Sequence, residues 1–252
     1  MTKTILLTGG TGKFGKILVR HFALNGWKVV TTSRSQSRID QIISEIGKTK
    51  EPIIGIEIDL FQQKAPEKLI KELGRKEISI THLINNARSQ EALAVQKNGT
   101  TRQKDFLNEM KMNVIIPYQL TIELAFSNKH QLKSVVNIGS MYGIVAPNPT
   151  LYNGSLNKSP IQYGTSKAAL HHLTRELAVR LASQEIRVNC VAFGGVEGRT
   201  DESFHDRYAQ LVPSRRMLKE SEIIGPINFL VDASSSSVNG HILIADGGWS
   251  IW

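Results

Sequence analysis

The sequence of 252 residues has little cysteine, few aromatic residues and no long apolar run. Its single cysteine, Cys190, excludes an intrachain disulfide and fits a reducing compartment. No stretch approaches the roughly 18 apolar residues of a membrane-spanning helix. The first residues, MTKTILLTGG, lack the apolar segment and cleavage site of a secretory signal. We therefore expect a cytoplasmic protein that does not enter a membrane.

Positive charge is abundant but scattered, with a formal net charge of +9 and only 6% aromatic residues. A nucleic-acid surface would combine a basic stripe with stacking rings, and the sequence shows neither. It also lacks a group of His, Cys, Asp and Glu residues with metal-ligand spacing. We expect no nucleic acid and no metal. The charge fits a phosphorylated cofactor or an acidic small-molecule substrate.

Apolar residues alternate between two periodicities along the chain. Short runs rich in Val, Ile and Leu predict buried strands at residues 4–8, 28–32, 53–58, 82–85, 134–138, 187–192 and 241–245. Segments with helical spacing occupy residues 12–25, 37–47, 66–73, 101–127, 161–183 and 220–232. This alternation predicts an α/β fold, a doubly wound (Rossmann-type), mostly parallel seven-stranded sheet with helices on both faces. No linker divides the chain, so we expect one domain over residues 1–252.

The first predicted strand leads into a glycine-rich turn. Gly10, Gly12 and Gly15 spell G-x-G-x-x-G between a strand and a helix. Glycines permit a tight turn and close approach of the backbone to a pyrophosphate, and the helix N-terminus offers free N–H groups. A plain strand–helix turn is the alternative. The position between strand and helix favours a dinucleotide site.

The second predicted strand ends without the carboxylate that NAD-preferring proteins use to bind the ribose 2′-hydroxyl. Arg34 follows it, with Arg38 nearby and Lys13 in the glycine turn. A guanidinium can bind a 2′-phosphate through two parallel, charge-assisted hydrogen bonds. We therefore expect NADP(H) to be preferred, with NAD(H) possible. Solvated surface charges are the alternative.

Tyr163 and Lys167 lie four residues apart at the start of a helical segment. Residues with this separation share one face of a helix. A lysine cation beside a phenol stabilises the phenolate, so the phenol can give a proton to a ketone oxygen or take one from an alcohol. Of the five tyrosines, only Tyr163 has such a lysine. The pair alone is weak evidence, but together with a dinucleotide site it predicts hydride-transfer chemistry.

The order and spacing of these motifs resemble the short-chain dehydrogenase/reductase family, in its compact single-domain branch. The matching segments are the glycine loop at Thr8–Gly15, Asp59-Leu60, the N-N-A-G turn at Asn85–Arg88, Asn113, Ser140, the Tyr163/Lys167 pair, Asn189–Gly195 and Asp246–Gly248. The resemblance covers nearly the whole chain. It implies a catalytic set of Asn113, Ser140, Tyr163 and Lys167.

Each member of that set has an implied role. Tyr163 is the acid/base, and Lys167 stabilises its phenolate and binds the nicotinamide ribose. Ser140 polarises the reacting oxygen, and Asn113 holds a water. The alternatives are an ordinary loop hydroxyl for Ser140 and a helix-capping or core amide for Asn113. The implied cofactor-binding residues are Gly9, Gly10, Gly12, Lys13, Phe14, Gly15, Arg34, Asp59, Leu60, Asn86, Ala87, Tyr163, Lys167, Gly195 and Val196.

Three residues depart from the family pattern: Lys13 replaces a loop glycine, Arg88 the glycine of N-N-A-G and Phe193 the proline of N-x-V-x-P-G. The segment between Ser140 and Tyr163 is also unusually long. This layout is similar to flagellin-modification and sugar-type reductases. The polar residues of this long segment are expected to contact a substrate with many hydroxyls; they are Asn148, Tyr152, Asn153 and Asn157.

Two segments near the carboxyl end are expected to contact substrate or a second subunit. Residues 199–216 resemble the family's flexible substrate lid; its arginines either bind an anionic group or lie on solvated helix faces. Trp249 and Trp252 are expected to be buried at a subunit contact. The family commonly forms tetramers, so a homo-oligomer, tetramer or dimer, is expected.

The leading interpretation is an NADP(H)-dependent oxidoreductase that transfers a hydride between nicotinamide and a carbonyl or secondary alcohol, with Tyr163 as acid/base. A polar, sugar-like or acidic small molecule is the expected substrate. A 3-oxoacyl-type reductase, an epimerase or dehydratase with tightly held cofactor, and a non-catalytic cofactor-binding sensor are the alternatives. The compact length disfavours the epimerase, and the complete catalytic set disfavours the sensor.

Overall fold

The computed structural model describes residues 3–155, 158–198 and 200–252. Seven strands form one parallel sheet in the order β3-β2-β1-β4-β5-β6-β7. They are β1 (Thr4–Leu7), β2 (Lys28–Ser33), β3 (Ile53–Glu57), β4 (His82–Asn85), β5 (Ser134–Ser140), β6 (Arg187–Phe193) and β7 (Ile242–Ala245). The strand order reverses between β1 and β4, which places a binding crevice at their carboxyl ends. The predicted doubly wound sheet is confirmed.

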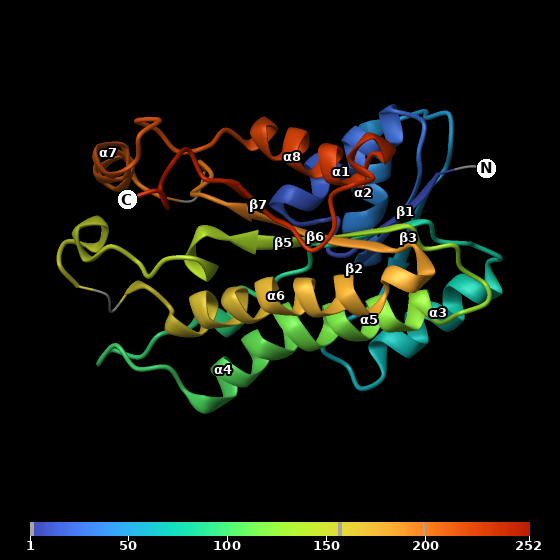
Figure 1. The fold of residues 1–252 in the computed structure, drawn as a ribbon, viewed down its shortest axis with the longest axis horizontal. Coiled ribbons are helices and arrows are strands. Elements are labelled where there is room, and N and C mark those ends of the chain that lie inside the picture. The colour runs from blue at the N-terminus through green and yellow to red at the C-terminus, as the bar shows by residue number, and fades with distance from the viewer. Residues whose placement is uncertain (1–2, 156–157, 199) are drawn as a thin grey trace.

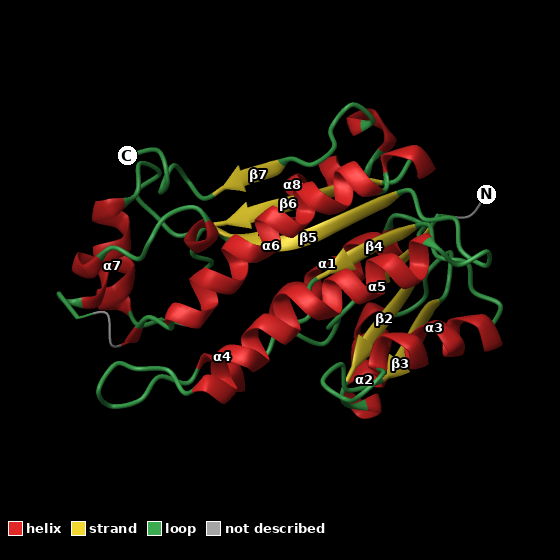
Figure 2. Cartoon of the chain, turned by 60° about the horizontal axis from the view of Figure 1, so that its bottom comes forward, coloured by secondary structure: helices red, strands yellow, loops and turns green. Residues whose placement is uncertain are grey.

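Helices cover both faces of this sheet (Figure 1). One face carries α1 (Lys13–Leu24), α2 (Gln36–Ile46) and α8 (Ile224–Val231). The other carries α3 (Ala65–Arg75), α4 (Gln103–Met110), α5 (Ile116–Ala125) and α6 (Ile161–Arg180). A further helix, α7 (Glu202–Leu211), stands beyond the carboxyl ends of β6 and β7 (Figure 2). In the part of the chain that the structure describes, no helix is long and apolar enough for a membrane crossing.

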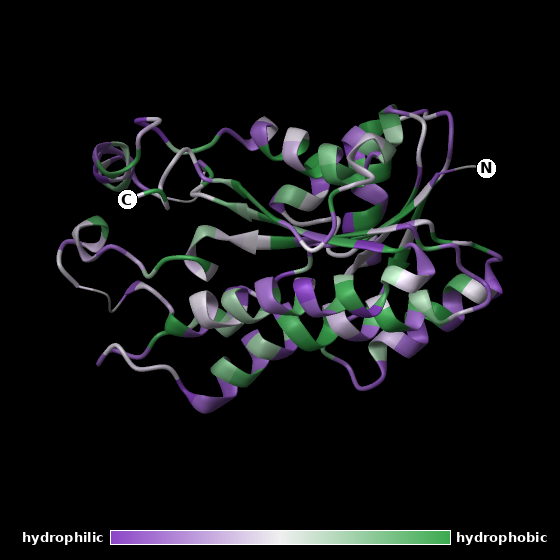
Figure 3. Ribbon diagram, viewed as in Figure 1, coloured by the Kyte–Doolittle hydropathy of each residue, from purple (hydrophilic) through white to green (hydrophobic). Residues whose placement is uncertain are grey.

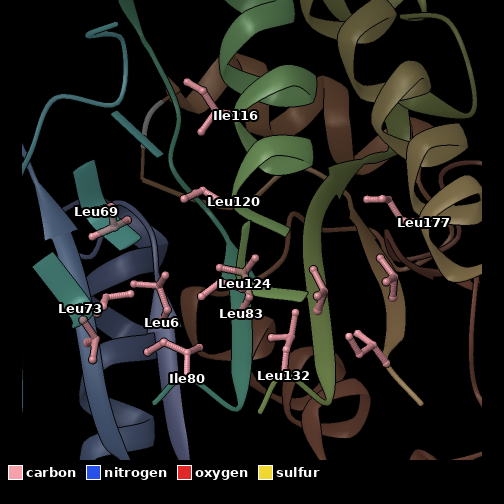
Figure 4. Packing of buried hydrophobic residues seen from close by; sticks show 14 of the residues in the cluster. Leu6, Leu69, Leu73, Ile80, Leu83, Ile116, Leu120, Leu124, Leu132 and Leu177 are labelled. Carbon is pink, nitrogen blue, oxygen red and sulfur yellow. The ribbon is translucent and has the colours of Figure 1, made fainter. Parts of the chain in front are cut away.

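The core consists of two apolar layers, one on each side of the sheet. Side chains alternate along a strand, so Leu6 of β1 enters one layer while Ile5 and Leu7 enter the other. In the first layer, Leu69 and Leu73 of α3 and Leu120 and Leu124 of α5 surround Leu6 and Leu83 (Figure 4). Hydrophobic residues concentrate on the strands and polar residues on the outer helix surfaces (Figure 3). This layering fixes the sheet and leaves its carboxyl-end edge for function.

The helix predicted over residues 101–127 is interrupted. A π-helical turn, Lys111–Ile115, separates α4 from α5 and contains the predicted catalytic residue Asn113. Pro117 in the first turn of α5 has no N–H to donate to the carbonyl of Asn113 four residues earlier. Such π turns occur frequently at functional sites. The apolar spacing alone could not reveal this change in helix type.

The prediction for the terminal tryptophans is wrong for Trp249. Its side chain is only 5% exposed and is buried within its own chain, stacked on Tyr208 of α7 at a ring-centre distance of 4.6 Å. Met217 and Val212 belong to the same apolar cluster. Trp252 is 76% exposed. The sequence did not reveal this packing because α7 lies in the segment expected to be a lid.

Two buried histidines make stability depend on pH. Burial lowers the pKa of His82 and of His171 to about 4, with neighbouring lysine and arginine charges adding to the effect. Unfolded histidine takes up its proton near pH 6.5, so between about pH 6.5 and pH 4 the unfolded state binds more protons. The free energy of unfolding is therefore expected to fall as the pH is lowered through this range.

His82→Leu should reduce that fall by about 2 kcal/mol between about pH 7 and about pH 5, measured by urea unfolding. His241→Leu removes an exposed imidazole and serves as the control, with the pH dependence of the wild type. An identical pH dependence in His82→Leu and wild type would contradict the assignment of His82 as a neutral buried side chain.

Candidate active site

A cavity of about 760 Å³ opens where strands β1, β2, β4, β5 and β6 end. The residues that directly follow these strands form its walls. All predicted site residues line it except Gly10, Gly15 and Asn113, which lie beneath its surface. The cavity thus joins the predicted cofactor-binding and catalytic residues at one edge of the sheet.

The glycine turn packs too closely for side chains. A Cβ on Gly15 would lie 2.6 Å from the Cα of Gly10, and one on Gly10 would overlap the side chain of Thr31. Gly9 has a φ of +70°, and its Cβ would lie 2.9 Å from the Cα of Ala87. The N-cap of α1 is Gly12, so no side chain caps the first-turn N–H groups. These groups face the cavity edge and fit an anionic phosphate.

Asn86 ties this turn to the loop after β4. Its Nδ2 donates hydrogen bonds to the carbonyl oxygens of Thr8 (2.9 Å) and Gly9 (3.2 Å). The Thr8 hydroxyl in turn accepts from the N–H groups of Asn86 and Ala87, each at 3.0 Å. The Asn86 side chain is therefore used to fix the backbone of the turn.

Cationic side chains at the outer end of the cavity have different surroundings. Arg34 forms an exposed ion pair of 3.3 Å with Glu91, whereas Lys13, largely shielded from solvent, lies 3.1 Å from Glu220. Exposed ion pairs contribute only about 0–1 kcal/mol to stability, so Arg34 can leave Glu91 for an anion that binds it more strongly. Asp59 also lines this end, where its Oδ1 accepts from the N–H of Phe61 at 3.0 Å.

The predicted catalytic side chains converge from three elements. Ser140 ends β5, and its Oγ accepts a hydrogen bond of 3.2 Å from the N–H of Tyr142, which leaves its proton free to donate. Tyr163 lies in the first turn of α6, half-buried. The Lys167 ammonium, one turn later, lies 5.8 Å from the centre of the Tyr163 ring. It donates to the carbonyl of Ile138 (2.7 Å) and to Oδ1 of Asn113 (3.3 Å).

Burial determines the protonation of the groups around Lys167. It lowers the pKa of Lys167 itself, whereas Tyr163, Cys190 and Glu109 raise it. Burial raises the pKa of Cys190 to about 12, so this thiol is neutral and packs as an apolar side chain. A phenol beside a buried ammonium, opening to a cavity, can act in proton transfer.

Comparison with known proteins decides the family. The short chain dehydrogenase family model matches residues 3–209. The chain belongs to the short-chain dehydrogenase family. This is a family of NAD(P)-dependent oxidoreductases, and the Rossmann-type sheet and glycine turn described above are those of its members.

Individual relatives of this short-chain dehydrogenase match nearly the whole of its chain. The post-translational flagellin modification protein A of Campylobacter coli is 24% identical over 99% of this chain and 98% of its own. The uncharacterized short-chain type dehydrogenase/reductase y4vI of Sinorhizobium fredii is 30% identical over 98% of this chain, which spans 43% of that relative's length. A short chain dehydrogenase from Leptospira borgpetersenii, solved with bound NAD+, superposes with a TM-score of 0.85 at 25% identity, covering 99% and 93% of the two chains.

Aromatic residues, most of them not predicted, line the end of the cavity beside α7. The hydroxyls of Tyr142 and Tyr152 lie 3.0 Å apart, and the Tyr152 ring meets Phe204 of α7 edge-on at 6.0 Å. Tyr208 of α7 accepts a hydrogen bond of 2.9 Å from the N–H of Gly195. Only Tyr152 was among the residues expected to contact substrate. Composition gave no signal for the others, because the fold brings them together.

Asn148 and Asn153, which were expected beside Tyr152, do not line the cavity. Asn148 caps a short helical turn by accepting from the N–H of Thr150, and Asn153 ends that turn with a positive φ of 55°. Local backbone hydrogen bonding, the usual role of asparagine in turns, takes precedence over substrate contact here. Asn157 lies outside the described residues.

The predicted lid is an ordered helix with its arginines engaged. Arg207 of α7 donates to the carbonyl of Leu151 at 2.9 Å, which holds α7 against the loop after β5. Arg216 forms a two-pronged contact with Glu222 at 2.6 and 2.7 Å. Arg215 donates to the carbonyl of Gln210 at 3.4 Å, and Arg199 lies outside the described residues. In the described residues, these three arginines therefore contact groups of the protein itself.

Two of the departures from the family pattern fill the cavity wall. The Arg88 guanidinium lies over the Tyr163 ring at 5.2 Å, and its side chain is exposed into the cavity. Phe193, in place of the family's proline, meets Phe14 edge-on at 5.7 Å. Arg88 thus brings a positive charge beside the predicted acid/base.

Proposed function

We propose that this chain is a single-domain cytoplasmic enzyme that transfers a hydride between NADP(H) and a carbonyl or secondary-alcohol carbon. The observation that supports this most is the convergence of Ser140, Tyr163 and Lys167 on the cavity that also contains the glycine turn. Tyr163 is the proposed acid/base. A polar, sugar-like or acidic substrate fits the end of the cavity beside α7, where the hydroxyls of Tyr142 and Tyr152 lie.

The residues present fit a dinucleotide. The uncapped N-terminus of α1 and the side-chain-free glycine turn would hold the pyrophosphate. Lys167 and Tyr163 would hold the nicotinamide ribose, and Asp59 and Leu60 would lie at the adenine. When bound, the cofactor supplies the hydride chemistry, and the protein contributes placement and electrostatics.

The chain's own residues manage the proton. In carbonyl reduction, the Tyr163 hydroxyl gives its proton to the substrate oxygen, while the Ser140 hydroxyl donates a hydrogen bond to the same oxygen. The Lys167 ammonium stabilises the phenolate that remains. The carbonyl of Asn113, which receives no helical bond from Pro117, is placed to bind a water that returns the proton from solvent.

The Arg34 side chain supports the preference for NADP(H). Arg34→Glu is expected to weaken NADPH binding roughly 10- to 100-fold and NADH binding much less, because only NADPH carries the 2′-phosphate that the guanidinium would bind. Fluorescence titration with both cofactors measures this ratio. Arg20→Glu, a charge reversal on the exposed face of α1, is the matched control and should change neither. Equal losses for both cofactors in Arg34→Glu would remove the argument for NADP(H).

Three side chains favour an acidic or polar substrate. Arg88 offers a guanidinium beside the reacting end, and in the described residues no carboxylate forms an ion pair with it. The hydroxyls of Tyr142 and Tyr152, which line the same cavity, offer hydrogen bonds. An acyl chain would fit a wall with fewer polar groups better.

The outer surface of α4 and α5 supports a homo-oligomer. Exposed apolar side chains recur there at helical spacing; they are Leu107, Ile115, Tyr118 and Phe126. Ile161 and Val179 are exposed on the neighbouring α6. A stripe of this kind is normally covered, and a second copy of the chain would cover it in a dimer or tetramer.

Turnover on a carbonyl panel tests the proposed function. The panel contains keto sugars, keto acids and an acetoacetyl thioester, each with NADPH and with NADH. Net oxidation of NADPH with a keto sugar or keto acid is the expected result. Preference for the thioester would favour a 3-oxoacyl reductase, and rearrangement without net cofactor change an epimerase. Cofactor binding without any turnover would favour a sensor and contradict the proposal.

A further inference from the structure

A buried carboxyl group lies behind the catalytic side chains. Glu109, near the end of α4, has no exposed surface. Its Oε1 accepts a hydrogen bond of 2.6 Å from Nδ2 of Asn113. Its Oε2 is buried and has no hydrogen-bond partner among the described residues. An ionised carboxylate in this position costs free energy unless it compensates another charge, and without such a charge it takes up a proton.

Asn113 connects this carboxyl to the catalytic lysine. Its Oδ1 accepts from the Lys167 ammonium at 3.3 Å, while its Nδ2 donates to Glu109 and, at 2.9 Å, to the Ser166 hydroxyl. The Ser166 hydroxyl in turn donates a hydrogen bond of 2.9 Å to the carbonyl oxygen of Tyr163. The amide oxygen therefore faces a cation and the amide nitrogen faces an acceptor. This orientation favours an ammonium at one end and a carboxylate at the other.

The surroundings of Lys167 leave Glu109 as its balancing charge. The phenol of Tyr163 lies on the same helix, the neutral thiol of Cys190 on β6, and the Arg88 guanidinium comes from the loop after β4. His171, one turn along α6, is held neutral because burial lowers its pKa to about 4. The pKa of Glu109 is raised, because burial raises it more than Asn113, Lys167 and Arg88 lower it.

We propose that Glu109 is an ionised positioning residue that acts through Asn113 to keep Lys167 protonated and to set the pH range of the Tyr163–Lys167 pair. The four residues with implied catalytic roles do not include Glu109. The proposal rests on the proposed function in one respect, that this pair performs the proton transfer. It assigns a use to a buried acid that the hydride transfer itself does not require.

Glu109→Gln separates charge from hydrogen bonding, because the amide oxygen of Gln still accepts from Asn113. Removing a negative charge beside a coupled pair makes the loss of both its protons easier. Both limbs of the pH–rate profile for alcohol oxidation should therefore move by about one unit toward acid. Glu123→Gln, an exposed change of the same charge on α5, is the matched control and should leave the profile in place.

Glu109→Asp keeps the charge on a shorter side chain. Both limbs of the pH–rate profile of Glu109→Asp should therefore stay at the pH values of the wild type, even if the rate itself falls. An unshifted profile in Glu109→Gln would overturn the proposal, since the side chain would then act only as a hydrogen-bond acceptor. If Glu109→Gln does not fold, carbon-13 NMR of glutamate-labelled wild type decides. The signal missing from Glu109→Asp should report a carboxylate at about pH 7, and a protonated carboxyl there would overturn the proposal.

A measurement without substrate keeps this inference separate from the proposed function. The phenolate absorbance of Tyr163 is obtained by subtracting the absorbance of a Tyr163→Phe variant from that of the same protein with Tyr163 intact. This is done for wild type and for Glu109→Gln. The titration midpoint of this absorbance should move toward acid by the same amount in Glu109→Gln. A moved midpoint in a protein that turns over no carbonyl would uphold the link to Glu109 and reject the proposed function. An unmoved midpoint in an enzyme that reduces carbonyls would reject the link to Glu109 and uphold the proposed function.

Discussion

Tyr163→Phe is expected to lower kcat for carbonyl reduction roughly 10²- to 10⁴-fold, the usual contribution of a positioned general acid. The substitution removes one oxygen and keeps the ring, so the packing against Arg88 and the fold should persist. NADPH affinity should change only a few-fold. The rate is read from the loss of NADPH absorbance, and the affinity from fluorescence titration.

Tyr118→Phe provides the matched control, because Tyr118 is an exposed tyrosine on α5. It should retain the rate of the wild type. An undiminished rate in Tyr163→Phe with the true substrate would contradict the assignment of the proton donor. It would leave the fold and the dinucleotide site untouched.

Lys167→Met is expected to lower kcat roughly 10²-fold or more and also to lower the melting temperature. The ammonium is buried and donates hydrogen bonds to Ile138 and Asn113. Removing one partner of a buried charge pair costs about 3–5 kcal/mol, because the remaining charge, here the one proposed for Glu109, is left uncompensated. Catalysis also loses the cation that stabilises the phenolate, so kcat per folded molecule should fall as well.

Calorimetry and steady-state kinetics on the same preparation measure these two effects. Lys48→Met removes an exposed lysine after α2 and should change neither. If Lys167→Met lost activity only in proportion to unfolded protein, Lys167 would be a structural residue and not a catalytic one.

Periodicity predicted the sheet because its strands are buried on both faces. All seven predicted strands are present to within a few residues at either end, and each is paired in parallel. The glycine turn could also be predicted, because its glycines are required by local backbone geometry and by the close approach of neighbouring segments. The predicted site residues converge because parallel strands bring their carboxyl ends to one edge, which makes a linear motif order spatially meaningful.

Features that depend on contacts between distant segments could not be predicted from the sequence. Tyr208 and Trp249 stack on each other although 41 positions separate them in the sequence, and no local pattern predicts such a contact. Glu109 had one local signal, its position one helical turn before Asn113, but its burial follows from the packing of α4 against α6. The role of Asn148 and Asn153 was misjudged because turn formation and substrate contact require the same polar side chains.

The central claim is that the Tyr163 phenol, supported by Lys167, faces the nicotinamide. A crystal structure of the complex with NADP+ tests it most directly. We predict that the nicotinamide lies in the cavity with the hydroxyls of Tyr163 and Ser140 both directed at the space beside its reactive carbon. A nicotinamide bound elsewhere, or a Tyr163 side chain turned out of the cavity in that complex, would contradict the claim.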